Sequence, residues 1–134
     1  MLQAKSETLA IRDEPDVVLV RRRVAQMGEE LGFTTLARTK IVTAASELGR
    51  NTLIHGRGGS VCIEILATTD RPGLRLTFED TGPGIPDVQQ AMADGFTTAR
   101  GLGLGLNGSR RLVDKFEIAS RPGDGTRVTV TQWA

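Results

Sequence analysis

Cysteine and histidine are almost absent from this sequence, which contains one of each, Cys62 and His55. One cysteine cannot form an internal disulfide or a cysteine-based zinc site, and one histidine is too few for a histidine-rich metal centre. Tyrosine is missing and aromatic residues make up 4% of the chain, so stacking surfaces for single-stranded nucleic acid are not expected. The longest apolar run, Val17 to Val20, is far shorter than the roughly 20 residues of a membrane span. We expect a cytoplasmic protein with no membrane contact.

Net charge is also small, at +1 from 17 Lys and Arg against 16 Asp and Glu. This balance excludes a globally basic nucleic-acid-binding protein. Arg21 to Arg23 form a local basic cluster, which we interpret as a solvated helix face because acidic residues lie nearby. With 134 residues, 25% charged and 39% hydrophobic, the chain predicts one globular domain over residues 1–134.

Apolar periodicity predicts two long helices near the N-terminus. Val17, Val20, Val24, Met27 and Leu31 follow at steps of three and four, after a possible cap at Asp13 and before a stop at Gly32. A second helix runs from Thr34 or Thr35 to about His55 and stops at Gly56; we expect His55 to have a structural role there. A short helix over 88–93 and a third main helix over 106–115 complete the helices.

Alternating apolar residues predict five strands, at 8–12, 61–68, 74–79, 116–120 and 126–132. Tight hairpins at 70–73 and 122–125 connect the later strands in pairs. The expected fold class is an α+β two-layer sandwich, with a mixed, mostly antiparallel sheet of about five strands and three main helices on one face. Cys62 falls within a strand and is expected in the core.

Glu47 and Asn51 lie one turn apart on the second helix, so their side chains point into the same space. A carboxamide oxygen is a suitable ligand for Mg²⁺, and a carboxylate can accept a proton from an attacking hydroxyl. Taken alone, the pair is also compatible with a solvated helix face.

Asp80 to Pro86 form a Gly-Pro-rich loop that directly follows a strand. An aspartate at this position can accept a hydrogen bond from an exocyclic amine. The glycines allow the backbone to approach a flat ring closely. An ordinary turn is the alternative interpretation.

The segment from Gly101 to Ser109 is rich in glycine and opens a helix, which suits a polyphosphate. Gly103 to Gly108 match the spacing of a dinucleotide-binding fingerprint, but no apolar strand precedes them and too little chain follows for that fold. A Walker A motif is absent as well. We expect residues 95–105 to be a mobile lid, in which Arg100 either meets a terminal phosphate or is merely exposed.

The three segments together, in this order, resemble the GHKL ATPase superfamily. Within it, Glu47 to Asn51, Asp80 to Pro86, Asp94 to Thr98 and the Gly-Leu-Gly run look most like the serine/threonine kinases of partner-switching systems, of the stressosome switch type. Leu53 to Gly56 look more like the anti-sigma factors proper.

The resemblance implies ATP and Mg²⁺ as cofactors. By it, Glu47 is the general base, Asn51 holds Mg²⁺, and Asp80 and Gly84 read the adenine, with Thr126 completing that site. The implied nucleotide-binding residues are Asn51, Asp80, Gly82, Gly84, Ile85, Thr97, Thr98, Arg100, Gly101, Leu102, Gly103, Leu104, Gly105, Leu106 and Thr126.

The implied function is phosphorylation of a small protein of the anti-sigma-factor-antagonist class, with a downstream output protein or sigma factor as second partner. The alternative is an anti-sigma factor that sequesters its partner when nucleotide is bound, with little turnover. A detached histidine-kinase catalytic domain is disfavoured because no helix with a phospho-accepting histidine fits before Thr8. Direct nucleic-acid binding is not expected, and a monomer is favoured over a homodimer.

Overall fold

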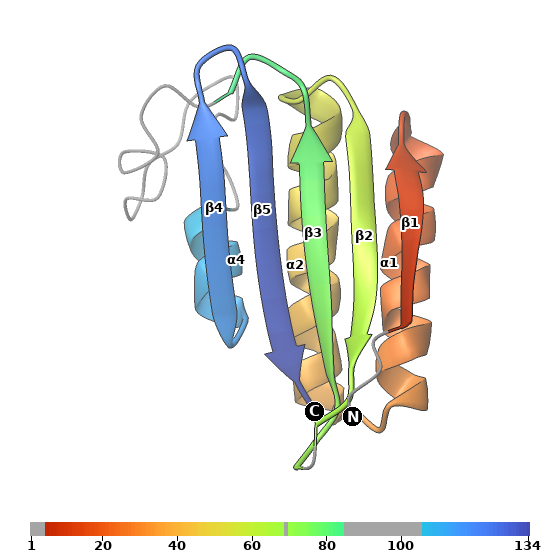
Figure 1. Cartoon of the computed structure of the whole chain (residues 1–134). Helices are drawn as coiled ribbons and strands as arrows, with labels where there is room; N and C mark the ends of the chain where they lie inside the picture. Colours follow the sequence, from red (N-terminus) through yellow and green to blue (C-terminus); the bar gives the residue numbers. More distant parts are fainter. Residues whose placement is uncertain (1–4, 69, 85–105) are drawn as a thin grey trace.

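The computed structural model describes residues 5–68, 70–84 and 106–134 and arranges them in two layers, a five-stranded sheet and a layer of helices on one face of it (Figure 1). In chain order the elements are β1 (Lys5–Ile11), α1 (Glu14–Glu30), α2 (Thr35–Ile54), β2 (Gly59–Leu66), β3 (Gly73–Asp80), α4 (Leu106–Leu112), β4 (Lys115–Arg121) and β5 (Gly125–Trp133). The predicted fold class is confirmed. The helix expected over 88–93 lies outside the described residues.

The strand order is β1-β2-β3-β5-β4, and all four pairings are antiparallel. The expected mixed sheet is therefore antiparallel throughout the described strands. β3 and β4 do run in the same direction, as strands joined across a helix do. They are not neighbours, because β5 folds back from β4 and inserts between the two. This insertion brings the end of β3 beside the start of β5.

Local signals explain α1. The side chain of Asp13 accepts a hydrogen bond from the backbone N–H of Asp16, and a proline occupies the first turn. Val17, Val20, Val24 and Met27 are buried as the periodicity predicts, while Leu31 is only partly buried. Gly32 follows with a φ of +79°, the left-handed conformation that ends a helix.

α2 crosses the middle of the sheet and packs against both α1 and α4. Thr34 caps it by accepting a hydrogen bond from the N–H of Ala37 at 3.1 Å. One side of the helix is buried and comprises Ile41, Ala44, Ala45, Leu48 and Thr52. The hydroxyl of Thr52 is satisfied by the carbonyl of Leu48 at 2.9 Å. This side fixes which face of α2 remains available to a ligand or partner.

Alternation along the strands separates a helix-facing side from a helix-free side. In β3, Leu74, Leu76 and Phe78 point toward the helices and are buried. In β2, Val61 pairs with Phe78, so Cys62 points to the helix-free side and is partly exposed. The expectation of a core cysteine was wrong, because only the strand pairing decides which face of a continuous apolar run is buried. α4 is also shorter than expected, ending at Leu112 rather than Lys115.

Candidate functional site

Asp80 is the last residue of β3 and lies two positions after the buried Phe78, so its side chain leaves the sheet on the helix-facing side. Its Oδ1 accepts a hydrogen bond from the N–H of Gly82 at 2.9 Å. Partial burial raises the pKa of the Asp80 carboxyl, and backbone N–H groups of Gly82 and Thr126 offset this only in part. The site therefore holds a partly desolvated carboxylate that gains from a further hydrogen-bond donor.

Glycines surround Asp80 because no side chain fits there. A Cβ atom at Gly56 would lie 2.3 Å from Cγ of Asp80 and 2.5 Å from its Oδ2. A Cβ atom at Gly125 would lie 2.1 Å from the carbonyl oxygen of Asp80, and one at Gly82 would lie 2.8 Å from Cα of Gly56. The end of α2, the end of β3 and the start of β5 thus meet at Asp80.

Gly56 is a functional candidate that the sequence-based site residues do not include, since the sequence indicates only a helix stop and part of a family resemblance at this position. Nothing local in the sequence distinguishes a glycine that ends a helix from one that also contacts another strand. The signal is entirely tertiary: 24 positions separate Gly56 from Asp80, yet their atoms are in contact.

Thr126 stands beside Asp80 in the sheet, because β3 and β5 pair these two residues directly. On its other side Thr126 pairs with Ser120 of β4, and the two hydroxyl oxygens are 2.8 Å apart. Ser120 Oγ also donates to the carbonyl oxygen of Gly125 at 3.1 Å. Three polar side chains therefore form one row across three strands.

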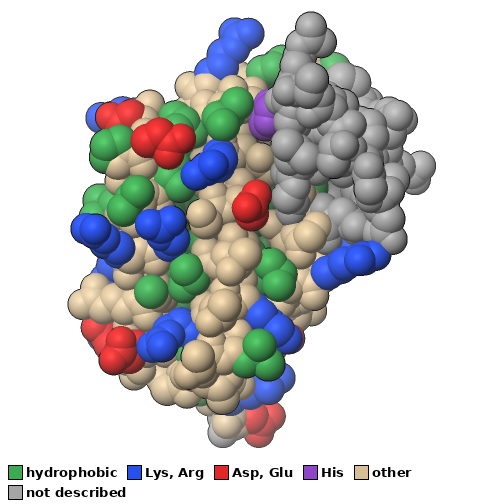
Figure 2. Space-filling view, turned by 180° about the vertical axis from the view of Figure 1, so that it is seen from behind, with side chains coloured by type: hydrophobic (Ala, Val, Ile, Leu, Met, Phe, Trp, Pro, Cys, Tyr) green, Lys and Arg blue, Asp and Glu red, His purple; other side chains and the backbone are tan. Residues whose placement is uncertain are grey.

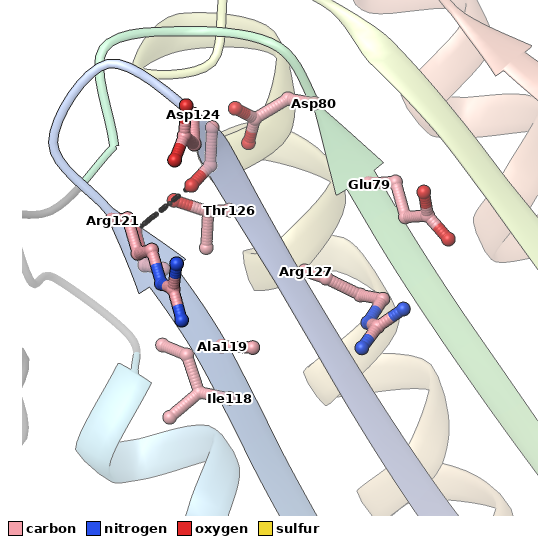
Figure 3. Close-up of a pocket in the computed structure, with 10 residues that line it drawn as sticks. Glu79, Asp80, Ile118, Ala119, Arg121, Asp124, Thr126 and Arg127 are labelled. Atoms are coloured by element: carbon pink, nitrogen blue, oxygen red, sulfur yellow. Dashed lines mark hydrogen bonds between the residues drawn. The ribbon is translucent and has the colours of Figure 1, made fainter.

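The row borders a cavity of about 500 Å³ at the β4–β5 hairpin, whose residues Arg121 and Asp124 also contribute to the lining (Figure 3). Glu79 and Arg127 line the cavity from the helix-free side of the sheet, because they alternate with Asp80 and Thr126. The cavity thus extends over both faces of the sheet end. Asp80 and Thr126 line its helix-facing part.

Gly84 lies against the β4–β5 hairpin. Its φ is +78°, and a Cβ atom there would come 2.1 Å from the carbonyl oxygen of Arg121. The neighbouring Pro83 carbonyl accepts a hydrogen bond from the N–H of Gly123 at 2.7 Å. Gly84 therefore lets the loop after β3 close over the hairpin, a packing role beside the base-reading role that the sequence predicts.

Glu47 and Asn51 occupy the last two turns of α2. Glu47 is exposed, while Asn51 is partly buried. The backbone carbonyl of Asn51 accepts hydrogen bonds from the N–H groups of His55 and Gly56, at 2.9 and 3.2 Å. Because Gly56 contacts Asp80, this last turn ties the position of Asn51 to that of the carboxylate. Along the end of α2, the predicted general base Glu47 is thus followed by the predicted Mg²⁺ ligand Asn51, and the helix then ends beside Asp80, the residue predicted to read adenine.

Leu106 is buried at the start of α4, so only its backbone is available for the predicted phosphate contact. The other predicted residues of the loop and lid lie outside the described residues: Ile85, Thr97, Thr98, Arg100, Gly101, Leu102, Gly103, Leu104 and Gly105. Among the described residues, no group of three or more His, Cys, Asp or Glu side chains could hold a metal ion. Within the same residues, no helix combines the length and apolarity that crossing a bilayer requires.

Comparisons with known proteins found relatives over most of the chain. The chain is 42% identical over 123 residues to the serine/threonine-protein kinase RsbT of Bacillus subtilis (strain 168), covering 92% of each sequence. It is 34% identical over 118 residues to the anti-sigma F factor of Thermoanaerobacter sp. (strain X514), covering 84% of this chain and 82% of that one.

A solved structure shares the fold. The crystal structure of the RsbU and RsbW domains of Rv1364c from Mycobacterium tuberculosis matches with a TM-score of 0.66 at 21% identity, over 97% of this chain and 32% of that longer chain.

Residues 36–133 also match a family model, and this range contains α2 apart from its first residue, all strands except β1, and every predicted site residue. The chain belongs to the family of histidine kinase-, DNA gyrase B- and HSP90-like ATPases.

Proposed function

We propose that this chain is a serine/threonine protein kinase of a partner-switching system, which transfers a phosphoryl group from ATP·Mg²⁺ to a small protein of the anti-sigma-factor-antagonist class. The observation that carries the proposal is the 42% identity to a serine/threonine-protein kinase over nearly the whole of both chains. The reaction would take place in the cytoplasm and regulate a downstream output protein or sigma factor.

The described residues fit a bound nucleotide. Asp80 supplies a partly desolvated acceptor for an exocyclic amine, Thr126 supplies a second polar group beside it, and the glycines allow the neighbouring backbone to pack closely against Asp80. The carboxamide of Asn51 is the oxygen ligand that we assign to Mg²⁺, which neutralises phosphate charge when bound. The glycines of the loop before α4 are assigned to the phosphates, together with Thr97, Thr98 and Arg100.

Exposure of Glu47 supports its role as general base toward a protein substrate. The attacking hydroxyl belongs to another molecule, so the general base must be accessible from solvent. Glu47 meets this requirement, because it is exposed on α2. In the proposed step the hydroxyl oxygen bonds to the γ-phosphorus, the bond from that phosphorus to ADP breaks, and the hydroxyl proton passes to Glu47.

The test separates binding from chemistry. Glu47→Ala is expected to bind ATP·Mg²⁺ like the unmodified chain and to lose phosphoryl transfer by roughly 100-fold or more, because a general base acts only on the attacking group. Asn51→Ala is expected to lose nucleotide binding itself. Calorimetric titration measures the first property, and transfer of labelled γ-phosphate to an antagonist-class protein measures the second.

Glu30→Ala is the matched control, since Glu30 is an exposed glutamate at the end of α1. Normal transfer by Glu47→Ala, or normal ATP affinity in Asn51→Ala, would contradict the assigned roles.

A second candidate function is a nucleotide-dependent anti-sigma factor that sequesters its partner with little turnover. The observation that favours it is the match to an anti-sigma F factor over most of both chains. Nucleotide-dependent capture of an output protein, with no detectable transfer to any antagonist, would favour this alternative over the kinase.

A further inference from the structure

Ser120 and Thr126 form a hydroxyl pair next to Asp80, and the other hydrogen bond of Ser120 favours one direction for the bond between them. Ser120 Oγ lies 2.8 Å from Thr126 Oγ1 and 3.1 Å from the carbonyl oxygen of Gly125. A carbonyl oxygen can only accept, so the bond to Gly125 uses the single proton of the serine hydroxyl. While this bond is made, Ser120 can only accept from Thr126, and we infer that the threonine proton points toward β4.

This direction decides what Thr126 offers to a ligand. With its proton engaged by Ser120, the threonine hydroxyl presents only lone pairs to any further partner. Asp80 sits beside it in the same row of the sheet and is likewise an acceptor when ionised. The end of the sheet therefore presents two adjacent acceptors, Asp80 and Thr126, which are labelled in Figure 3 and share the helix-facing side because the strands pair them.

Two adjacent acceptors suit the exocyclic amine of a purine better than a carbonyl group. An exocyclic amine carries two protons and can donate to both, whereas a carbonyl oxygen at the same ring position would place an acceptor against two acceptors. A freely rotating hydroxyl would lose this distinction, because it could turn its proton toward a carbonyl. Leaving a buried polar group unpaired is what makes such a mismatch costly.

We propose that Ser120 is a specificity-determining residue that acts through Thr126: it holds the threonine hydroxyl as an acceptor, so that the site selects a 6-amino purine over a 6-oxo purine. The inference deepens the proposed function, on which it rests, and assigns Ser120 a positioning role. Ser120 itself need not touch the base.

The test compares ATP with inosine triphosphate, which replaces the amine by a carbonyl. Calorimetric titration gives the ratio of the two dissociation constants for the unmodified chain, for Ser120→Ala and for Ser120→Thr. In Ser120→Ala the preference for ATP is expected to fall by about tenfold, the size of one hydrogen-bond term. Ser120→Thr keeps a hydroxyl at this position and is expected to restore the ratio.

A control variant and a double variant separate this role from a general effect on the sheet. Thr129→Val disrupts a similar hydroxyl pair, with Thr77 at 3.5 Å, on the helix-free side of the same strand, and should leave the ratio unchanged. In a Thr126→Val background, where there is no hydroxyl to orient, Ser120→Ala should no longer change the ratio.

An unchanged ratio in Ser120→Ala, or equal losses for both nucleotides, would overturn the proposal. A further change in the Thr126→Val background would show that Ser120 does not act through Thr126 and would overturn it as well. These outcomes differ from failure of the proposed function, in which the unmodified chain would bind no ATP or transfer no phosphate.

Discussion

Among single residues, Asp80 is one at which folding stability and ligand binding have opposite requirements. Packing against Gly56 removes water from the Asp80 carboxylate, and hydrogen bonds from the backbone N–H groups of Gly82 and Thr126 offset only part of this desolvation. The same desolvation leaves the carboxylate able to gain from a ligand amine. Desolvation of Asp80 thus lowers the stability of the nucleotide-free protein and at the same time favours binding of a ligand amine.

Asp80→Asn is expected to raise the melting temperature of the nucleotide-free protein near pH 7 while weakening ATP binding. The pKa of Asp80 in the folded chain is raised above its ordinary value of 3.8, so the unfolded chain ionises more readily. The loss of folding stability caused by the Asp80 charge is therefore absent below the ordinary pKa. It develops as pH rises through the pKa of Asp80 in the folded chain. The gain in melting temperature should shrink as pH is lowered to about 4.

Calorimetric melting curves across this pH range measure the effect. Asp124→Asn is the matched control, since Asp124 is exposed on the neighbouring hairpin. A difference that grows in acid, or none at all near neutrality, would contradict the prediction.

At the scale of elements, the important feature is the contact between the end of α2 and the end of β3. α2 carries Glu47 and Asn51, and β3 carries Asp80, so the geometry of the site depends on how these two ends meet. They meet through Gly56, whose missing side chain allows the approach. This contact thereby fixes the position of the end of α2 relative to the end of β3.

Gly56→Ala is expected to force these ends apart, because the new Cβ atom would lie 2.5 Å or less from three atoms of Asp80. Overpacking of this kind costs about 1–3 kcal/mol of stability. ATP affinity should fall by roughly tenfold or more, since displacement of Asp80 removes a charge-assisted hydrogen bond. Denaturant unfolding and calorimetric titration measure the two effects.

Gly28→Ala provides the comparison, because its nearest neighbour would be the flexible Arg38 side chain at 3.3 Å from the new atom. It should retain ATP affinity. Equal behaviour of the two variants would show that the contact at Gly56 does not position Asp80.

At the scale of the whole molecule, the apolar stripe of α1 is used inside the domain. Val17, Val20, Val24 and Met27 are all buried against the chain's own core, so they are not available to a second copy. The large apolar side chains exposed among the described residues are Leu19, Leu36 and Ile54. On the helix side of the molecule, apolar side chains are interspersed with charged ones rather than joined in one patch (Figure 2).

We therefore expect the isolated chain to be a monomer at low micromolar concentration, as light scattering would show. Val20→Glu should unfold the protein, because Val20 is 0% exposed, and so it is not a test of dimerisation. Leu19→Glu, at a side chain that is 54% exposed, should fold normally and change nothing. A stable dimer that Leu19→Glu dissociates would refute the expected monomer.

Most of the described helices and strands could be predicted from the sequence alone, because their signals are local. The cap residues Asp13 and Thr34, the stop at Gly32 and the apolar spacing of both long helices act within a few residues of each other. Alternation in β3 likewise predicted its buried side. The sequence also placed Asp80 at a strand end and Glu47 one turn from Asn51, since both statements concern neighbouring residues.

Only the tertiary structure decided which elements meet. The insertion of β5 between β3 and β4 puts Thr126 beside Asp80, and strand pairing turns Cys62 away from the core. The fit of Gly56 against Asp80 and the hydrogen bonds of Ser120 join segments that no local pattern relates. The physical reason is that local conformation depends on adjacent residues, whereas the site depends on close packing between residues far apart in the chain.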